Sequence, residues 1–287
     1  MAKKFIRSTE PLIPPIFTPE EILFYKWLGG FVDGDGYFAH YEKRNETSLN
    51  ISQASWNLHL LEQLKEKFGG SLMKINKGER SNAYLYRLAK RDNLIELLHG
   101  INGYIRATSR TVQFKKFCNL YNITYIEPNV LTPDDPYLAG MFDADGSINL
   151  NHNGLNRGRG LRIRMSAKYK SDIECYKTIY NGSISTSQTQ DCSEWQIGTQ
   201  KDILYTQKFL VRYVRSNKLI RLKLAPLFYE LKEIKAYQLD SPLYGNWQQF
   251  VEDWYNNGAD FYRKDCTGRP YTQEARQLRA LENDLDE

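Results

Sequence analysis

Several stretches of the chain alternate apolar and polar positions with the period of a β-strand. In residues 47–52 the odd positions face one way and the polar even positions the other, as in a strand with one buried face. Residues 161–166 repeat this pattern, and residues 71–76 and 83–88 predict a further strand pair. Segments with a helical apolar period lie between them. The order helix, hairpin, helix, hairpin, helix predicts an α+β fold with antiparallel sheets, not a doubly wound sheet.

One segment occurs twice. Leu28–Gly36 and Leu138–Gly146 share the frame Leu-small-Gly-apolar-apolar-Asp-small-Asp-Gly, and their final aspartates are 110 positions apart (145 − 35). Later segments correspond as well, since 68–72 matches 180–184. A repeat of this length predicts two related structural units in one chain.

The repeat divides the chain. We expect a first half at 20–121 and a second half at 137–240, joined by a proline-containing linker at 122–136. Residues 1–19 and 241–287 are then extensions outside the repeat.

Each copy of the repeated segment predicts a helix with a stripe of small residues. Gly30 and Gly34 are four positions apart in the first copy, as are Gly140 and Ala144 in the second. Small residues let two helix backbones approach closely, so we expect the helices to pack together about a pseudo-twofold axis. The core of the first half would then receive the larger side chains Trp27, Leu28, Phe31 and Val32.

Asp35 and Asp145 end these predicted helices, and each precedes a glycine of the kind that follows helix C-termini. A carboxylate there opposes the helix dipole by roughly 0.3–1 kcal/mol, so a cation should lie nearby. Two such ends packed together would offer the oxygen ligands that Mg²⁺ prefers. The alternative is that each Asp-Gly pair only marks a turn; the matched frames of the two copies favour a site.

Leu28–Gly36 and Leu138–Gly146 resemble the two motifs of monomeric LAGLIDADG homing endonucleases, the second with Met141-Phe142 for Leu-Ile. The resemblance implies two αββαββα halves that form a saddle of antiparallel sheets on double-stranded DNA. It implies a monomeric, intron-encoded enzyme that cuts both strands of a long asymmetric site with Mg²⁺ or Mn²⁺, Ca²⁺ being a non-cleaving substitute. Asp35 and Asp145 would bind the metal, together with the carbonyls of Gly34 and Ala144.

The resemblance also implies a basic residue and a strand-end polar residue in each half. By alignment the basic residues are Arg110 and Lys218; the family usually has lysine, so Lys115 or Lys116 could replace Arg110. The polar residues would be Gln53 and, where the alignment slips by one position, Lys168. The alternative for each is an ordinary surface side chain.

The polar faces of the strands are expected to meet the DNA major groove, where Asn, Gln, Arg and Lys can read base edges. A merely solvated face would carry more Glu and Lys. The predicted DNA-binding residues of the first half are Tyr41, Lys43, Ser48, Asn50, Ser52, Lys74, Asn76 and Arg87. Those of the second half are Asn149, Asn151, Asn153, Arg162, Arg164, Thr186, Gln188 and Gln196.

Composition limits the function classes. The net charge of +5 over 287 residues is weak evidence for a nucleic-acid partner. The four scattered cysteines and four histidines argue against a disulfide framework, a zinc site or histidine-centred nuclease chemistry. The chain has neither a secretory signal nor a membrane-length apolar run, so we expect an intracellular protein, in an organelle by resemblance. Two alternatives remain: a maturase that binds host intron RNA, and a DNA-binding protein that does not cut.

Overall fold

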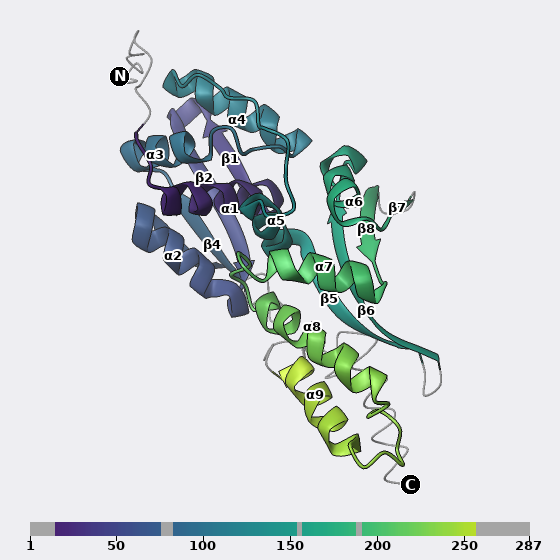
Figure 1. Ribbon diagram of the computed structural model, residues 1–287. Helices are drawn as coiled ribbons and strands as arrows, with labels where there is room; N and C mark the ends of the chain where they lie inside the picture. The colour runs from purple at the N-terminus through teal and green to yellow at the C-terminus, as the bar shows by residue number, and fades with distance from the viewer. Residues whose placement is uncertain (1–14, 76–82, 154–156, 188–190, 257–287) are drawn as a thin grey trace.

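The computed structural model describes residues 15–75, 83–153, 157–187 and 191–256 (Figure 1). The first half contains α1 (Pro19–Asp35), β1 (Gly36–Tyr41), β2 (Glu46–Ala54), α2 (Leu58–Phe68), β3 (Ser71–Ile75), β4 (Ala83–Leu88), α3 (Arg91–Ile101) and α4 (Thr108–Tyr121). The second half contains α5 (Pro136–Asp145), β5 (Gly146–Asn153), β6 (Arg157–Ala167), α6 (Glu174–Tyr180), β7 (Ser183–Ser187), β8 (Cys192–Ile197), α7 (Gln200–Leu210) and α8 (Lys218–Glu233), and α9 (Tyr244–Asn256) follows. Each half thus repeats the predicted order and ends in two helices where one was expected.

Each half is built around a four-stranded antiparallel sheet. The strand orders are β1-β2-β4-β3 and β5-β6-β8-β7. Gly36 follows the first motif helix and pairs with Ile51, and Gly146 follows the second and pairs with Met165. Ile51 and Met165 are therefore equivalent positions in the two sheets. The predicted α+β class with two pseudo-symmetric halves is confirmed. Figure 1 shows the sheets on either side of a central helix pair.

That central pair consists of α1 and α5, here called the motif helices. Each begins at a proline after a capping side chain: Thr18 accepts from the backbone of Glu21, and Asp135 accepts from that of Tyr137. A Cβ at Gly30 would collide with the Tyr137 carbonyl. The predicted packing through small residues is therefore confirmed.

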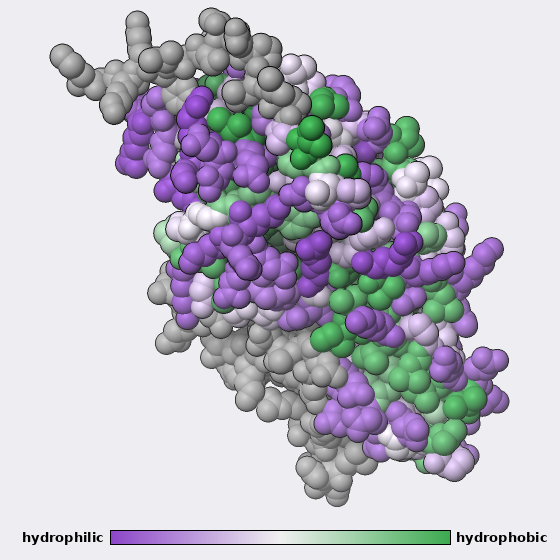
Figure 2. Space-filling model, turned by 60° about the vertical axis from the view of Figure 1, so that its left-hand side comes forward, coloured by the Kyte–Doolittle hydropathy of each residue, from purple (hydrophilic) through white to green (hydrophobic). Residues whose placement is uncertain are grey.

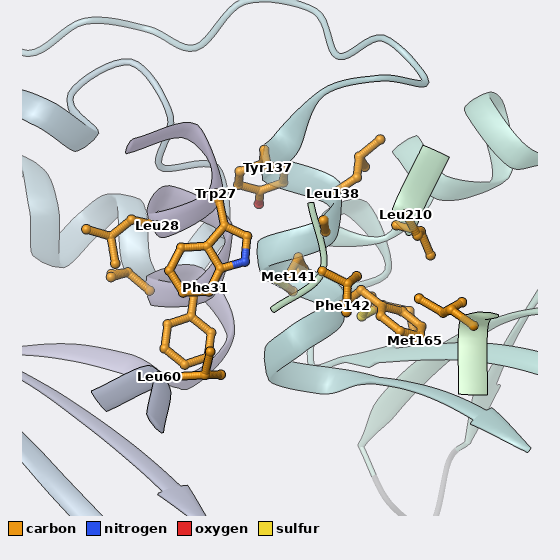
Figure 3. Close-up of a cluster of buried hydrophobic side chains, with 14 of the residues drawn as sticks. Trp27, Leu28, Phe31, Leu60, Tyr137, Leu138, Met141, Phe142, Met165 and Leu210 are labelled. Carbon is orange, nitrogen blue, oxygen red and sulfur yellow. The ribbon is translucent and has the colours of Figure 1, made fainter. Parts of the chain in front are cut away.

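Trp27 does not lie where the sequence placed it. Figure 3 shows its indole nitrogen directed toward the second motif helix, and Nε1 donates a 2.8 Å hydrogen bond to Asp143. The prediction that Trp27 only fills the core of its own half is wrong. A buried indole N–H needs an acceptor, and the Asp143 carboxylate supplies it across the interface.

The segment beyond the repeat joins the same core. The ring centroid of Phe228 on α8 lies 6.0 Å from those of Trp247 and Phe250 on α9. Buried Arg221 ties α9 to the second sheet by donating to the carbonyls of Trp254 and Ile148, both at 3.2 Å. Polar side chains cover much of the face in Figure 2, whereas apolar ones gather at the height of α8 and α9.

Residues 122–135 connect the halves without helix or strand. None of the helices in the described ranges combines the length and apolar character needed to cross a membrane.

Candidate active site

Asp35 and Asp145 are the final residues of the two motif helices. The helices touch through Gly34 and Ala144, so their ends meet: Oδ2 of Asp145 lies 3.1 Å from where a Cβ on Gly34 would stand. Each helix is closed by its following glycine, whose N–H donates to the carbonyl of Val32 or Phe142. The close approach of the two backbones therefore places two carboxylates at one point between the halves.

The electrostatics of this point favour a cation. Burial, and then repulsion from Asp145, raise the pKa of Asp35 to about 7. The charges of Lys218 and Arg110 and the hydrogen bond from Gln53 act in the opposite direction. Burial also raises the pKa of Asp145, and Lys218 and Arg110 oppose it. A bound divalent ion would lower the free-energy cost of ionising both acids together.

The donor atoms also fit such an ion. Carboxylate and carbonyl oxygens are the hard ligands that Mg²⁺ and Ca²⁺ take. In the described part of the chain no three His, Cys, Asp or Glu side chains cluster as a metal site. Protein coordination at this point would therefore consist of the two aspartates, with backbone carbonyls such as that of Gly34.

Lys218 lies at the end of the second motif helix. Its Nζ donates to the carbonyls of Phe142 (2.9 Å), Asp143 (2.8 Å) and Ala144 (3.1 Å). Burial lowers the pKa of this ammonium, while nearby aspartates raise it. Lys218 is thus the cation that the helix dipole required. Because it already binds the Ala144 carbonyl, that carbonyl is a less suitable metal ligand than the carboxylates.

Arg110 lies near the two aspartates, two residues into α4 of the first half. Its Nη1 donates to Gln113 at 2.9 Å, and its charge acts on Asp33, Asp145 and Asp35. The alternatives lie elsewhere: Lys115 pairs with Glu127 at 3.0 Å and Lys116 with Glu42 at 3.3 Å, both on the surface. Geometry therefore favours Arg110 as the counterpart of Lys218.

Gln53 contacts the first aspartate directly. It lies buried near the end of β2, and its Nε2 donates to Oδ2 of Asp35. Its Oε1 accepts from Nδ2 of Asn57 at 3.1 Å. The site thus contains five of the six predicted catalytic residues: Asp35, Asp145, Lys218, Arg110 and Gln53.

Lys168 is not part of this group. Because Gly36 pairs with Ile51 and Gly146 with Met165, the register equivalent of Gln53 is Ala167. Lys168 follows the end of β6, is exposed, and holds its ammonium 5.6 Å from the ring centroid of Tyr169. The structure therefore gives no support to the predicted role of Lys168.

Two further aspartates shape the site and were assigned no role from the sequence. Asp33 accepts from the backbone N–H groups of Arg106 (2.7 Å) and Ala107 (3.0 Å). Asp143 likewise accepts from Arg215 (2.8 Å) and Ser216 (3.0 Å). They hold the segments that lead to Arg110 and Lys218. Their signal was available, because both copies of the repeat carry an aspartate at this position.

On each sheet the face opposite the core is here called the open face, and by register it carries eight of the sixteen predicted DNA-binding residues. Those that share the open face by register are Ser48, Asn50, Ser52 and Arg87 in the first sheet and Asn149, Arg162, Arg164 and Gln196 in the second. Tyr41 ends β1 and Lys43 lies in the short 3-10 helix Glu42–Arg44, both exposed. Tyr37, opposite Asn50 and 42% exposed, shares this face and was missed.

Lys74 and Thr186 lie on the other face, so their predicted placement is wrong. Lys74 pairs with Tyr84, which has the same phase as the core residues of its strand. Thr186 pairs with Ser193, which also has the phase of the core side. Both are exposed although they have the core-side phase. β3 and β7 are the edge strands of their sheets, where charged and polar side chains are common.

The side chains of four predicted DNA-binding residues cannot be assigned to a face of the sheet. Asn76 and Gln188 lie outside the described residues, as do the side chains of Asn151 and Asn153. The backbone register pairs Asn151 with Gly160 and Asn153 with Arg157, with a bulge between them.

Ser48 and Asn50 are buried although they have the phase of the open face. Asn50 donates to Oγ of Ser48 at 3.0 Å. Arg87, opposite Asn50, pairs with Glu46, which precedes Ser48 by two positions on the same face. The ion pair therefore spans Ser48, and the two short side chains can reach a ligand only if it opens.

Comparisons with known proteins agree with this geometry. A family model described as LAGLIDADG endonuclease matches residues 28–121. The intron-encoded RNA maturase bI4 of Saccharomyces cerevisiae is 36% identical over 248 residues, which are 84% of this chain and 38% of the maturase. The intron-encoded DNA endonuclease ai2a of Dictyostelium discoideum is 29% identical over 240 residues, covering 80% of this chain and 74% of that protein.

Solved structures share the fold. The LAGLIDADG meganuclease I-AabMI, bound to uncleaved DNA, matches with a TM-score of 0.62 at 18% identity, over 79% of this chain and 98% of the meganuclease.

The chain spans 38% of the yeast maturase and 37% of the probable intron-encoded endonuclease aI2 of Debaryomyces hansenii, which is 32% identical.

Proposed function

Because the chain belongs to the LAGLIDADG endonuclease family, we propose that it is a metal-dependent endonuclease that cuts both strands of a long DNA site. The observation that carries the proposal is the meeting of Asp35 and Asp145 at the ends of the motif helices. Nothing in the packing of the described residues requires an acid at both ends, and burial, followed by repulsion from Asp145, raises the pKa of Asp35. Such a pair is explained by a ligand that carries positive charge.

The chemistry follows from the groups present. Divalent ions held by these aspartates supply an activated water, charge neutralisation and a stabilised leaving oxygen when bound. Lys218 and Arg110 place fixed positive charge beside the carboxylates, where the phosphate gains charge in the transition state. Gln53 holds Asp35 in one orientation. We assign Mg²⁺ as the working ion, with Mn²⁺ able to replace it and Ca²⁺ binding without cleavage.

The open sheet faces supply the recognition surface. Their asparagine, glutamine and arginine side chains are types that read base edges in the major groove. The two faces differ in sequence, so the target is asymmetric and one chain suffices as a monomer. Counterion release should make binding weaken steeply with salt, and a flat response would contradict an extended DNA interface.

The test is cleavage of a randomised double-stranded DNA library with Mg²⁺. Wild-type protein is run beside the Asp35→Asn/Asp145→Asn double variant and the control Asp240→Asn, which changes an exposed acid outside the site. We expect one long asymmetric site to be enriched by the wild type and the control alone. Cleavage that persists in the double variant would place the active site elsewhere.

A second function is supported by the 36% identity to a yeast protein named as an RNA maturase. On this alternative the chain binds its host intron RNA, in an organelle, with or without DNA cleavage. RNA binding that is retained by the double variant, with no DNA cut by the wild type, would favour it.

A further inference from the structure

The first half of the site holds its aspartate through a chain of three hydrogen bonds. Gln53 donates to Asp35, Asn57 donates to Gln53 at 3.1 Å, and Asn57 Oδ1 accepts from the backbone N–H of Asn217 at 3.3 Å. The last group can only donate, so it fixes the orientation of both amides. Asn57 must present its oxygen to Asn217 and its NH₂ to Gln53, which then presents its own NH₂ to Asp35.

This chain crosses between the halves. Asn57 belongs to the first half, whereas Asn217 is the N-cap of α8, whose first residue is Lys218. Asn217 also donates its Nδ2 to the carbonyl of Trp56 at 2.6 Å. The orientation of Asp35 is therefore tied to the helix start that places Lys218.

The second half has the outer link of this chain but lacks the inner one. Asp172 corresponds to Asn57: it accepts from the backbone N–H of Thr108 (3.0 Å), the first residue of α4. The equivalent of Gln53 is Ala167, whose methyl group donates nothing. Among the described residues no side chain donates a hydrogen bond to the Asp145 carboxylate.

The basic residues do not create this difference. Lys218 and Arg110 each act on both Asp35 and Asp145. Positive charge is thus shared between the two sites, and the hydrogen-bonded support of the aspartate is the feature that differs.

We propose that the two DNA strands are cut at unequal rates, with the site on Asp35 the faster, and that Gln53 and Asn57 are its positioning residues. This inference rests on the proposed function. A carboxylate already held in one orientation needs no reordering when substrate binds, whereas Asp145 must lose conformational freedom first. One such charge-assisted hydrogen bond corresponds to about a tenfold difference in rate.

The experiment uses the target recovered from the library, with a different dye on each strand, under single-turnover conditions with Mg²⁺. We expect one strand to be cut about tenfold faster, and a supercoiled plasmid with this site to pass through an accumulating nicked circle. Equal rates on both strands would overturn this inference alone. Absence of cleavage on both strands would overturn the proposed function as well.

Variants assign the difference to residues. Gln53→Ala should slow only the faster strand, bringing the two rates together. Asn57→Asp copies the second half: it still accepts from Asn217 but no longer donates to Gln53, and should slow the same strand several-fold. Ala167→Gln should accelerate only the slower strand. These effects should appear in the rate constants and leave DNA affinity within about twofold.

Gln63→Ala, at an exposed glutamine on α2, is the matched control and should leave the strand ratio unchanged. Equal slowing of both strands by Gln53→Ala would show a general structural role and overturn the assignment. An unchanged slower strand in a folded Ala167→Gln protein would also contradict it. This second variant does not depend on Gln53→Ala being stable.

Discussion

The indole N–H of Trp27 on one motif helix donates to the carboxylate of Asp143 on the other, at 2.8 Å. The reverse contact is also present: the Tyr137 hydroxyl donates to Asp33 at 2.8 Å. Both aspartates also hold the backbone that leads to a basic residue of the site. The helix interface and the position of the basic residues are therefore maintained by the same two buried acids.

Asp143→Ala should lower the free energy of unfolding by about 2–4 kcal/mol, because it leaves Trp27 Nε1 and two backbone N–H groups buried without an acceptor. Asp143→Asn should cost less, since it retains one acceptor oxygen. Urea unfolding measures both. Asp240→Ala, at an exposed acid, should stay within about 0.5 kcal/mol of wild type. A loss as small for Asp143→Ala would show that the interface does not depend on this carboxylate.

Gly140→Ala should prevent the motif helices from packing, because the added methyl would overlap the carbonyl of Trp27 and lie 2.9 Å from the Phe31 nitrogen. We expect a loss of about 3 kcal/mol or more, measured by thermal denaturation. Gly245→Ala is the matched control: it lies in α9 with nothing within 4 Å of its Cβ position. Helix propensity predicts that the control gains up to about 1 kcal/mol. Equal melting temperatures for the two variants would contradict the close packing.

Asp35→Asn should change how stability depends on pH in metal-free buffer. The pKa of Asp35 is raised from 3.8 to about 7, so its stabilising contribution is complete below pH 4 and is lost as pH rises through 7. The wild type should therefore lose stability between pH 4 and pH 8, and the variant should lose less, remaining more stable at pH 8 by roughly 1 kcal/mol or more.

Melting curves at each pH, with chelator, measure this difference, and parallel profiles would contradict the raised pKa of Asp35. Asp33, whose pKa burial raises to about 6, gives the same trend in both proteins and cancels in the comparison. Adding Ca²⁺ at pH 8 should stabilise the wild type more than the variant, since the bound ion relieves the repulsion.

Lys218→Ala should slow cleavage about 100-fold or more while weakening DNA binding much less. The residue acts at the end of α5, where its ammonium contacts three carbonyls, and not on the open sheet face. Single-turnover rates and equilibrium binding separate the two effects. If cleavage rate and DNA affinity fell by the same factor, Lys218 would act only as a phosphate contact.

Arg110→Lys should retain cleavage, whereas Arg110→Ala should lose it. A lysine there keeps a positive charge beside Asp35 and Asp145, whereas alanine removes it. Rates for both variants on the same target measure the difference. If Lys115→Ala, which breaks a surface ion pair, were as slow as Arg110→Ala, the geometric choice of Arg110 would be wrong.

Much of the site could be predicted because the repeat aligns it with itself. The aspartates and Lys218 were found from their positions in matched frames, whereas Gln53 was proposed from the resemblance to LAGLIDADG proteins. The alignment failed at Lys168 because the second hairpin is longer: Gln53 lies 17 positions after Gly36 (53 − 36), whereas its register equivalent lies 21 positions after Gly146 (167 − 146). Pairing does so directly, since Gly146 opposite Met165 makes Ala167 the equivalent of Gln53.

By itself the sequence determined the two halves, their helices and strands, and the pair of acids, because local periodicity and internal repetition are properties of the chain alone. The tertiary structure alone decided which groups meet across the interface: Trp27 with Asp143, and Asn57 with the start of α8. It also decided that Lys74 lies on the core-side face and that an ion pair spans Ser48. The strand with which a strand pairs decides which of its side chains face the core. The hydrogen-bond partner of a buried polar group depends on which acceptor the fold brings within reach.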